Sequence, residues 1–139
     1  MLQTELTVSF NAPVDRLYHA WWDPELLQQW FCPAGMAVGQ VMSSFQVGGK
    51  FRIKVQQDNG SAYFIMGEYS EIVENQRLAF SWQWVDEPNV TQVTLDFSQQ
   101  GENGSQLTLC HTGFEDQEDR DLHQQAWIEC LEKLSTITL

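Results

Sequence analysis

Apolar residues alternate with polar ones along much of the chain, which is the pattern of half-buried β-strands. The clearest stretches are Leu6–Phe10, Phe51–Val55 and Leu107–His111. Within Asp58–Ser61 the Asn-Gly pair supplies the positive φ angles that a tight hairpin turn needs. The pattern therefore predicts one strand near the N-terminus and a succession of antiparallel strands between residues 36 and 112.

Two short helices are predicted between the first strand and the others, each beside a proline. Pro13 suits the first turn of a helix carrying Val14–Trp21, because its missing N–H costs nothing there. Asp23 is a good N-cap and Pro24 a good first residue for the second helix, which we expect to end near Trp30.

A long amphipathic helix is predicted at the C-terminus. The acidic connection Gly113–Asp121 precedes it, and acids stabilise the positive end of a helix dipole. With Trp127 beside it, the apolar stripe of this helix consists of Leu122, Ala126, Cys130, Leu131, Leu134 and Ile137. Antiparallel strands followed by one such helix indicate an α+β fold, with the helix laid across the sheet. No linker divides residues 1–139, so we expect a single domain.

Several short sequence motifs make the fold prediction more specific. In chain order they are Asn11–Trp21, Trp22–Phe31 with its Asp-Pro-Glu motif, Gly48–Arg52 with its Gly-Gly motif, Gly67–Ile72, Arg77–Trp82, Leu107–Phe114 and Trp127–Leu131. Together they cover almost the whole chain and resemble the START-like, or SRPBCC, superfamily. The branch that they resemble is named for a domain homologous to the C-terminal part of the activator of heat-shock protein 90 ATPase.

The resemblance implies a helix-grip fold, also called START-like or Bet v 1-like. In it a curved antiparallel sheet wraps around the long C-terminal helix, two short helices follow the first strand, and a cavity lies inside. The resemblance also implies a superfamily that binds lipids, sterols, polyketides and other apolar molecules, although one fold hosts many functions. The cochaperone has a separate N-terminal domain for which 139 residues leave no room, so we do not expect chaperone activation.

Charge narrows the possible partners. Seven basic and 19 acidic residues give a net charge of −12, which argues against nucleic acid and anionic membrane surfaces; the simplest role of this acidity is solubility. No run of about 18 apolar residues suggests a membrane span. The N-terminus, Met1–Glu5, lacks the features of a signal peptide, so we expect a cytoplasmic protein.

The residues that usually hold metals or cofactors show no recognisable spacing. The cysteines and histidines are Cys32, Cys110, Cys130, His19, His111 and His123. Three scattered cysteines indicate reduced thiols rather than disulfides, and no histidine has metal-ligand spacing with a cysteine. There is no Gly-x-Ser-x-Gly elbow and no phosphate-binding glycine loop. We therefore predict no metal, no cofactor and no catalytic set.

The aromatic side chains are the main candidates for a binding site. Rings of this number either pack the core or line a cavity, since ligand pockets are mostly apolar with a few placed polar groups. The candidate ligand-binding residues are Trp21, Trp30, Phe51, Phe80, Trp82, Trp84, His111, His123, Trp127 and Leu131.

Three polar residues each allow two interpretations. His111 shares a strand face with apolar residues, so it is either a polar anchor for a ligand or a core histidine bonded to a neighbour. His123 lies one helical turn before Trp127, either at the cavity rim or in solvent. Glu68 is either a buried acid or base, or a surface carboxylate paired with Arg52 or Lys54.

The resulting hypothesis is non-enzymatic binding of a small apolar or aromatic molecule between the sheet and the C-terminal helix. Trp82, Trp84 and Trp127 would form the walls and His111 the polar anchor. One alternative is a chaperone-related interaction module that uses an outer face. The other is an enzyme acting on a hydrophobic, polyketide-like substrate, which would need at least two polar groups converging in the cavity.

Overall fold

A seven-stranded antiparallel sheet and three helices make up the described part of the chain, residues 2–33, 35–137 and 139, in a computed structural model. The strands are β1 (Leu2–Phe10), β2 (Met36–Ser43), β3 (Lys50–Gln57), β4 (Ala62–Val73), β5 (Arg77–Trp84), β6 (Thr91–Gln100) and β7 (Gly104–Phe114). The helices are α1 (Val14–His19), α2 (Pro24–Trp30) and α3 (Gln117–Thr136).

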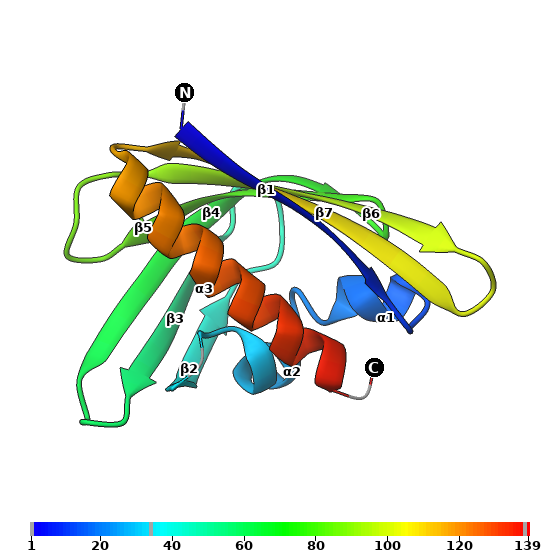
Figure 1. Cartoon of the computed structure of the whole chain (residues 1–139), viewed down its shortest axis with the longest axis horizontal. Coiled ribbons are helices and arrows are strands. Elements are labelled where there is room, and N and C mark those ends of the chain that lie inside the picture. Colours follow the sequence, from blue (N-terminus) through cyan, green and yellow to red (C-terminus); the bar gives the residue numbers. More distant parts are fainter. Residues whose placement is uncertain (1, 34, 138) are drawn as a thin grey trace.

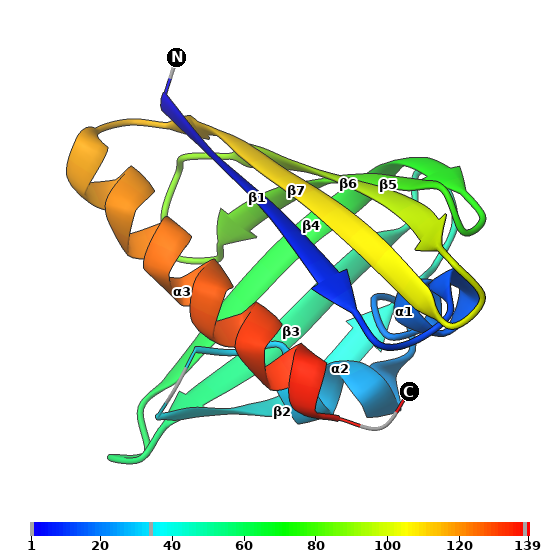
Figure 2. The same ribbon diagram turned by 45° about the vertical axis from the view of Figure 1, so that its right-hand side comes forward.

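The strand order is β1-β7-β6-β5-β4-β3-β2, so β2 to β7 form a meander and β1 joins its far edge. Leu6 of β1, for example, lies opposite Leu109 of β7. The sheet curves, and α3 runs across its concave side while α1 and α2 cover one end (Figures 1 and 2). The predicted α+β helix-grip fold is confirmed.

The alternation in sequence is the alternation between the two faces of the sheet. On β7, Leu107, Leu109 and His111 are fully buried, while Thr108 and Cys110 between them are half-buried. The inward-facing residues of neighbouring strands form one core beneath α3, which extends to the two short helices. This arrangement leaves α3 with one side against the sheet and the other in solvent.

The two short helices begin and end close to the predicted positions. Asp23 caps α2, since its side chain accepts a hydrogen bond from the Glu25 backbone N–H at 2.9 Å. Pro13 was predicted inside the first turn of α1 but lies one residue earlier, at the N-cap. Trp30 at the end of α2 is fully buried, and its indole N–H donates to the Ala20 carbonyl at 3.1 Å.

Helix α3 begins earlier than predicted. Asp116 is its N-cap and accepts a hydrogen bond from the Asp119 N–H at 2.8 Å, so the predicted connection as far as Asp121 was wrong in its second half. The predicted stripe also differs at two residues: Leu122 is 64% exposed, and Ile137 lies just after the helix.

Replacing Asp116 with alanine should lower the free energy of unfolding by about 1 kcal/mol, since the Asp119 N–H loses its cap. Urea unfolding would measure the change. Glu115→Ala is the matched control, because the neighbouring carboxylate of Glu115 is exposed and does not cap the helix. Equal losses in the two variants would contradict the prediction.

Candidate functional site

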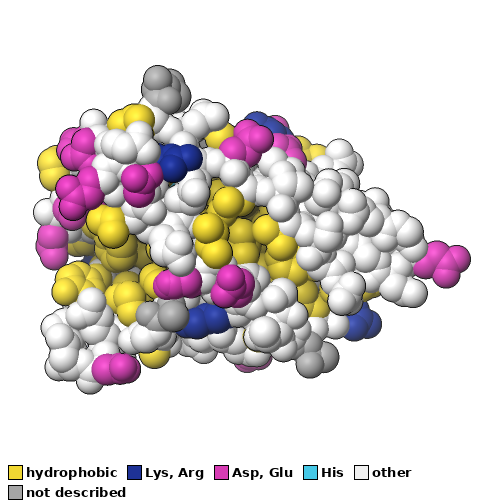
Figure 3. Space-filling view, viewed as in Figure 1, with side chains coloured by type: hydrophobic (Ala, Val, Ile, Leu, Met, Phe, Trp, Pro, Cys, Tyr) yellow, Lys and Arg dark blue, Asp and Glu magenta, His cyan; other side chains and the backbone are white. Residues whose placement is uncertain are grey.

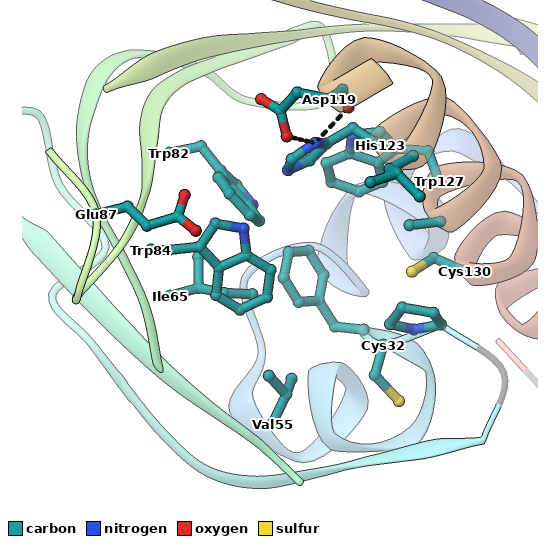
Figure 4. A pocket seen from close by; sticks show the side chains of 14 residues that line it. Cys32, Val55, Ile65, Trp82, Trp84, Glu87, Asp119, His123, Trp127 and Cys130 are labelled. Atoms are coloured by element: carbon teal, nitrogen blue, oxygen red, sulfur yellow. Dashed lines mark hydrogen bonds and ion pairs between the residues drawn. The ribbon is translucent and has the colours of Figure 1, made fainter. Parts of the chain in front are cut away.

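An apolar cavity of about 340 Å³ lies between β5, the first half of α3 and the segment that follows α2 (Figure 4). Its lining residues are Phe31, Cys32, Pro33, Val55, Ile65, Trp82, Trp84, Glu87, Asp119, Leu122, His123, Ala126, Trp127 and Cys130. The cavity is partly open to solvent. Figure 3 shows apolar side chains in a hollow at the left-hand end of the molecule, with acidic side chains gathered above it.

The sheet side of the cavity is built by strand alternation. Trp82 and Trp84 are two residues apart on β5, so both side chains face the same way, with ring centroids 4.9 Å apart at 88°. Ile65 on β4 lies opposite Trp84 in the register, and Val55 on β3 continues the wall. Trp82 is buried and Trp84 is half-buried, so the indole of Trp84 lies nearer to solvent.

The helix side is built by residues one turn apart. His123, Trp127 and Cys130 follow the i, i+4, i+7 spacing of one face of α3. Ala126 beside them has a side chain too small to fill the space. Phe31 packs edge-to-face against Trp127, with centroids 5.8 Å apart. The cavity is therefore walled by rings on three sides.

Behind this wall, His111 holds Trp127 and β6 in place. The indole N–H of Trp127 donates to His111 Nδ1 at 2.9 Å. Since an indole nitrogen can only donate, His111 Nδ1 must accept, and its proton is on Nε2. Nε2 then donates to Thr91 Oγ1 at 2.6 Å, and the Thr91 hydroxyl donates to the Trp82 carbonyl at 3.0 Å. Every polar atom of this chain of bonds is satisfied.

His111 is fully buried and does not line the cavity. Burial, with a smaller contribution from nearby His123, lowers its pKa to about 3, so the imidazole is neutral near pH 7. These contacts are those of a core histidine bonded to its neighbours, which is the second of the two interpretations that the sequence allowed.

His123 does lie at the cavity. Its Nδ1 donates to the Asp119 backbone carbonyl at 2.9 Å and lies 3.3 Å from the Asp119 carboxylate. Its ring meets Trp82 edge-to-face at 4.9 Å. Because Nδ1 carries the proton, Nε2 is an acceptor in the neutral ring, and Figure 4 shows this nitrogen turned toward Trp82.

The charged side chains that line the cavity are two carboxylates, Glu87 and Asp119. Figure 4 shows the Glu87 carboxylate directed toward Trp84. The ammonium of Lys133 lies behind the lining, where it donates to Cys32 Sγ and to the Pro33 carbonyl, both at 3.1 Å. Burial raises the pKa of the Cys130 thiol to about 12, so that thiol is uncharged.

The other predicted site residues lie elsewhere. Trp21, Phe51 and Phe80 surround a separate space of about 20 Å³ deeper in the core. Trp30 and Leu131 are buried in the core and line neither space. The structure thus brings together Trp82, Trp84, His123 and Trp127 from the predicted set, and not the others.

Sequence reasoning missed the residues that complete the lining. Val55 could have been found, because its alternation with Phe51 and Ile53 points it inward. Glu87 follows β5 in a turn, and no local pattern distinguishes it from other acidic turn residues. Glu68 is exposed on the outer face of β4, so the buried acid–base interpretation is wrong. Its register partner is Lys50 rather than either of the two expected bases.

The described residues contain no group of three or more His, Cys, Asp and Glu side chains placed to hold a metal ion. None of their helices combines the length and apolar character that crossing a membrane requires.

Solved structures with the same fold are numerous. Protein CV1439 from Chromobacterium violaceum is 22% identical and superposes with a TM-score of 0.89, over 96% of this chain and 94% of that one. The AHSA1 protein from Silicibacter pomeroyi is also 22% identical, with a TM-score of 0.84 over 96% and 94%. A protein from Arthrobacter aurescens is 24% identical, with a TM-score of 0.82 over 94% and 82%. At these identities the likeness shows the fold.

Among curated proteins, none matches this sequence closely enough to count as a relative. The family model described as "Activator of Hsp90 ATPase homolog 1-like protein" matches residues 11–138, which is nearly the whole chain. The chain therefore belongs to the family of Activator of Hsp90 ATPase homolog 1-like proteins, within the START-like superfamily.

Proposed function

We propose that this protein binds a small aromatic or apolar molecule in the cavity between β5 and α3, in the cytoplasm and without transforming it. The observation that carries this proposal is the cavity itself, which is walled by Trp82, Trp84 and Trp127 and is open to solvent on one side. Its volume of about 340 Å³ lies at the lower end of the range of small-molecule pockets.

The lining explains how affinity would arise. Transfer of apolar ligand surface from water into the cavity would stabilise the complex by about 25 cal/mol per Å², before the costs of association. The pocket is pre-formed, because the bond from Trp127 to His111 fixes one wall in the absence of a ligand. Because the walls are already ordered, ligand binding costs less conformational entropy of the protein.

Family membership supports a binding role in general terms. It is consistent with a ligand-binding or a chaperone-associated domain, and members are generally non-enzymatic. The open aromatic cavity favours the first of these two roles. Polar groups that line it, Glu87, Asp119 and His123, serve in this proposal to orient a ligand.

Filling the cavity should abolish binding. Ala126→Phe places a ring inside the cavity, and we expect it to weaken binding of the neutral fluorescent probe N-phenyl-1-naphthylamine at least tenfold, because the probe and the new ring need the same space. Fluorescence titration of the wild-type protein and of Ala126→Phe with the probe measures the change in affinity.

Gln125→Phe is the matched control for this experiment. It adds the same ring to the same helix at an exposed position that does not line the cavity. Unchanged probe affinity in Ala126→Phe, with thermal unfolding showing that the variant is folded, would refute the proposed site. Native mass spectrometry of protein from its own host would show a retained ligand as added mass.

A further inference from the structure

Resting on the proposed function, we infer that the ligand is an amine: an aromatic or apolar body that carries a protonated amino group, which lies at the mouth of the cavity between Glu87 and Asp119. The body enters among the indole rings, and the ammonium remains at the rim. The inference follows from the charges and hydrogen-bonding roles of the polar groups that line the cavity.

The side-chain groups at the rim are acceptors. The carboxylate of Glu87 makes no hydrogen bond or ion pair with any other described residue, and Figure 4 shows it directed toward Trp84. The carboxylate of Asp119 lies on the other side, 3.3 Å from His123 Nδ1. A ligand that complements two carboxylates must supply hydrogen-bond donors and positive charge, and an ammonium supplies both.

The aromatic walls of the cavity also favour a positively charged ligand group. The faces of indole rings are electronegative and attract a cation within about 6 Å, more strongly where water is excluded. Trp84 is half-buried beside Glu87, so a cation at the mouth would meet a ring face and a carboxylate together. An anionic head group would be repelled by both.

The surroundings of the mouth strengthen this preference. A shallow acidic groove shares Glu87, Asp119 and Leu122 with the cavity and is also lined by Glu115, Asp116 and Glu118. Carboxylates of one sign beside a cleft raise the local concentration of cations. The ammonium of Lys133 donates to Cys32 and Pro33 and does not line the cavity, so it offers an anion no exposed partner there.

A series of probes with one ring system tests the inference. 1-Naphthylmethylamine, 1-naphthalenemethanol and 1-naphthoic acid present a cation, a neutral group and an anion at pH 7. Calorimetric titration at low salt should show the amine binding roughly tenfold more tightly than the alcohol, and the acid more weakly than the alcohol. High salt should reduce the advantage of the amine and leave the affinity of the alcohol unchanged.

Charge-neutralising variants identify the groups responsible. In Glu87→Gln combined with Asp119→Asn, the advantage of the amine over the alcohol should fall to about threefold or less. The control is Glu102→Gln, which removes a carboxylate in the turn between β6 and β7, outside the cavity lining. It should keep the tenfold advantage.

The outcomes separate this inference from the proposed function. If the alcohol and N-phenyl-1-naphthylamine bind but the amine has no advantage, the inference is wrong and the binding function stands. An advantage that persists in the double variant, or disappears equally in Glu102→Gln, also overturns it. If no naphthyl probe binds the wild-type protein, the proposed function fails and the inference fails with it.

Discussion

Replacing His111 with leucine is expected to lower the free energy of unfolding by about 2–4 kcal/mol. The variant leaves the Trp127 indole N–H buried without an acceptor and removes the bond to Thr91. A buried donor without a partner costs about 1–3 kcal/mol by itself, and the different shape of leucine disturbs a fully buried site. Urea unfolding followed by tryptophan fluorescence measures the loss.

A second variant separates the lost hydrogen bond from general damage to the core. Trp127→Phe removes the donor, so it should be destabilising alone but less so when His111 is already leucine. The interaction free energy between the two positions, measured by this double-mutant cycle, should be about 1–2 kcal/mol. If the two losses simply add, the bond between Trp127 and His111 does not contribute as the geometry indicates.

Acid should destabilise the protein through the same histidine. The folded state holds the pKa of His111 near 3, whereas the unfolded chain takes up the proton near the ordinary value of 6.5. The unfolded state therefore binds more protons between these values, and stability falls as the pH falls from about 6.5 toward about 3. Between these two pKa values, His111 alone lowers the free energy of unfolding by about 1.4 kcal/mol for each pH unit of acidification.

Comparison with His111→Leu isolates this effect from the other titrating groups, which both proteins share. The difference in unfolding free energy between wild type and variant should be largest at pH 7 and about 2 kcal/mol smaller at pH 5. A difference that stays constant over this range would mean that His111 is not held neutral in the folded protein.

The architecture was largely predictable because it depends on local patterns. Strand alternation such as that of Phe51, Ile53 and Val55 requires one buried face, whatever the strand pairs with. Asp23 and Pro24 mark the start of α2 through backbone chemistry that involves only a few residues. The start of α3 was misplaced because several acids precede it, and only the backbone shows that Asp116 is the one that caps the helix.

The candidate site was predictable only in part. Trp82, Trp84 and Trp127 were expected at the cavity and lie there, while Trp21 and Trp30 have the same chemistry and lie in the core. Residue type cannot separate the two groups, because a ring packed by neighbours and a ring beside an empty space satisfy the same hydrophobic pattern. Glu87 was not singled out because its importance comes from the neighbours that the fold supplies.

By itself the sequence determined the strands, the helices and the apolar faces that must meet, because these follow from the period of the pattern and from turn and capping residues. Only the tertiary structure decided which aromatic rings enclose a space, which histidine is locked in the core and which faces the cavity. Those properties depend on the distances between β5, β7 and α3, segments far apart in the chain. His111 and His123 show the difference, although their ring centroids are only 5.4 Å apart. His111 is hydrogen-bonded through both ring nitrogens, whereas His123 is bonded through Nδ1 and has its other ring nitrogen available at the cavity.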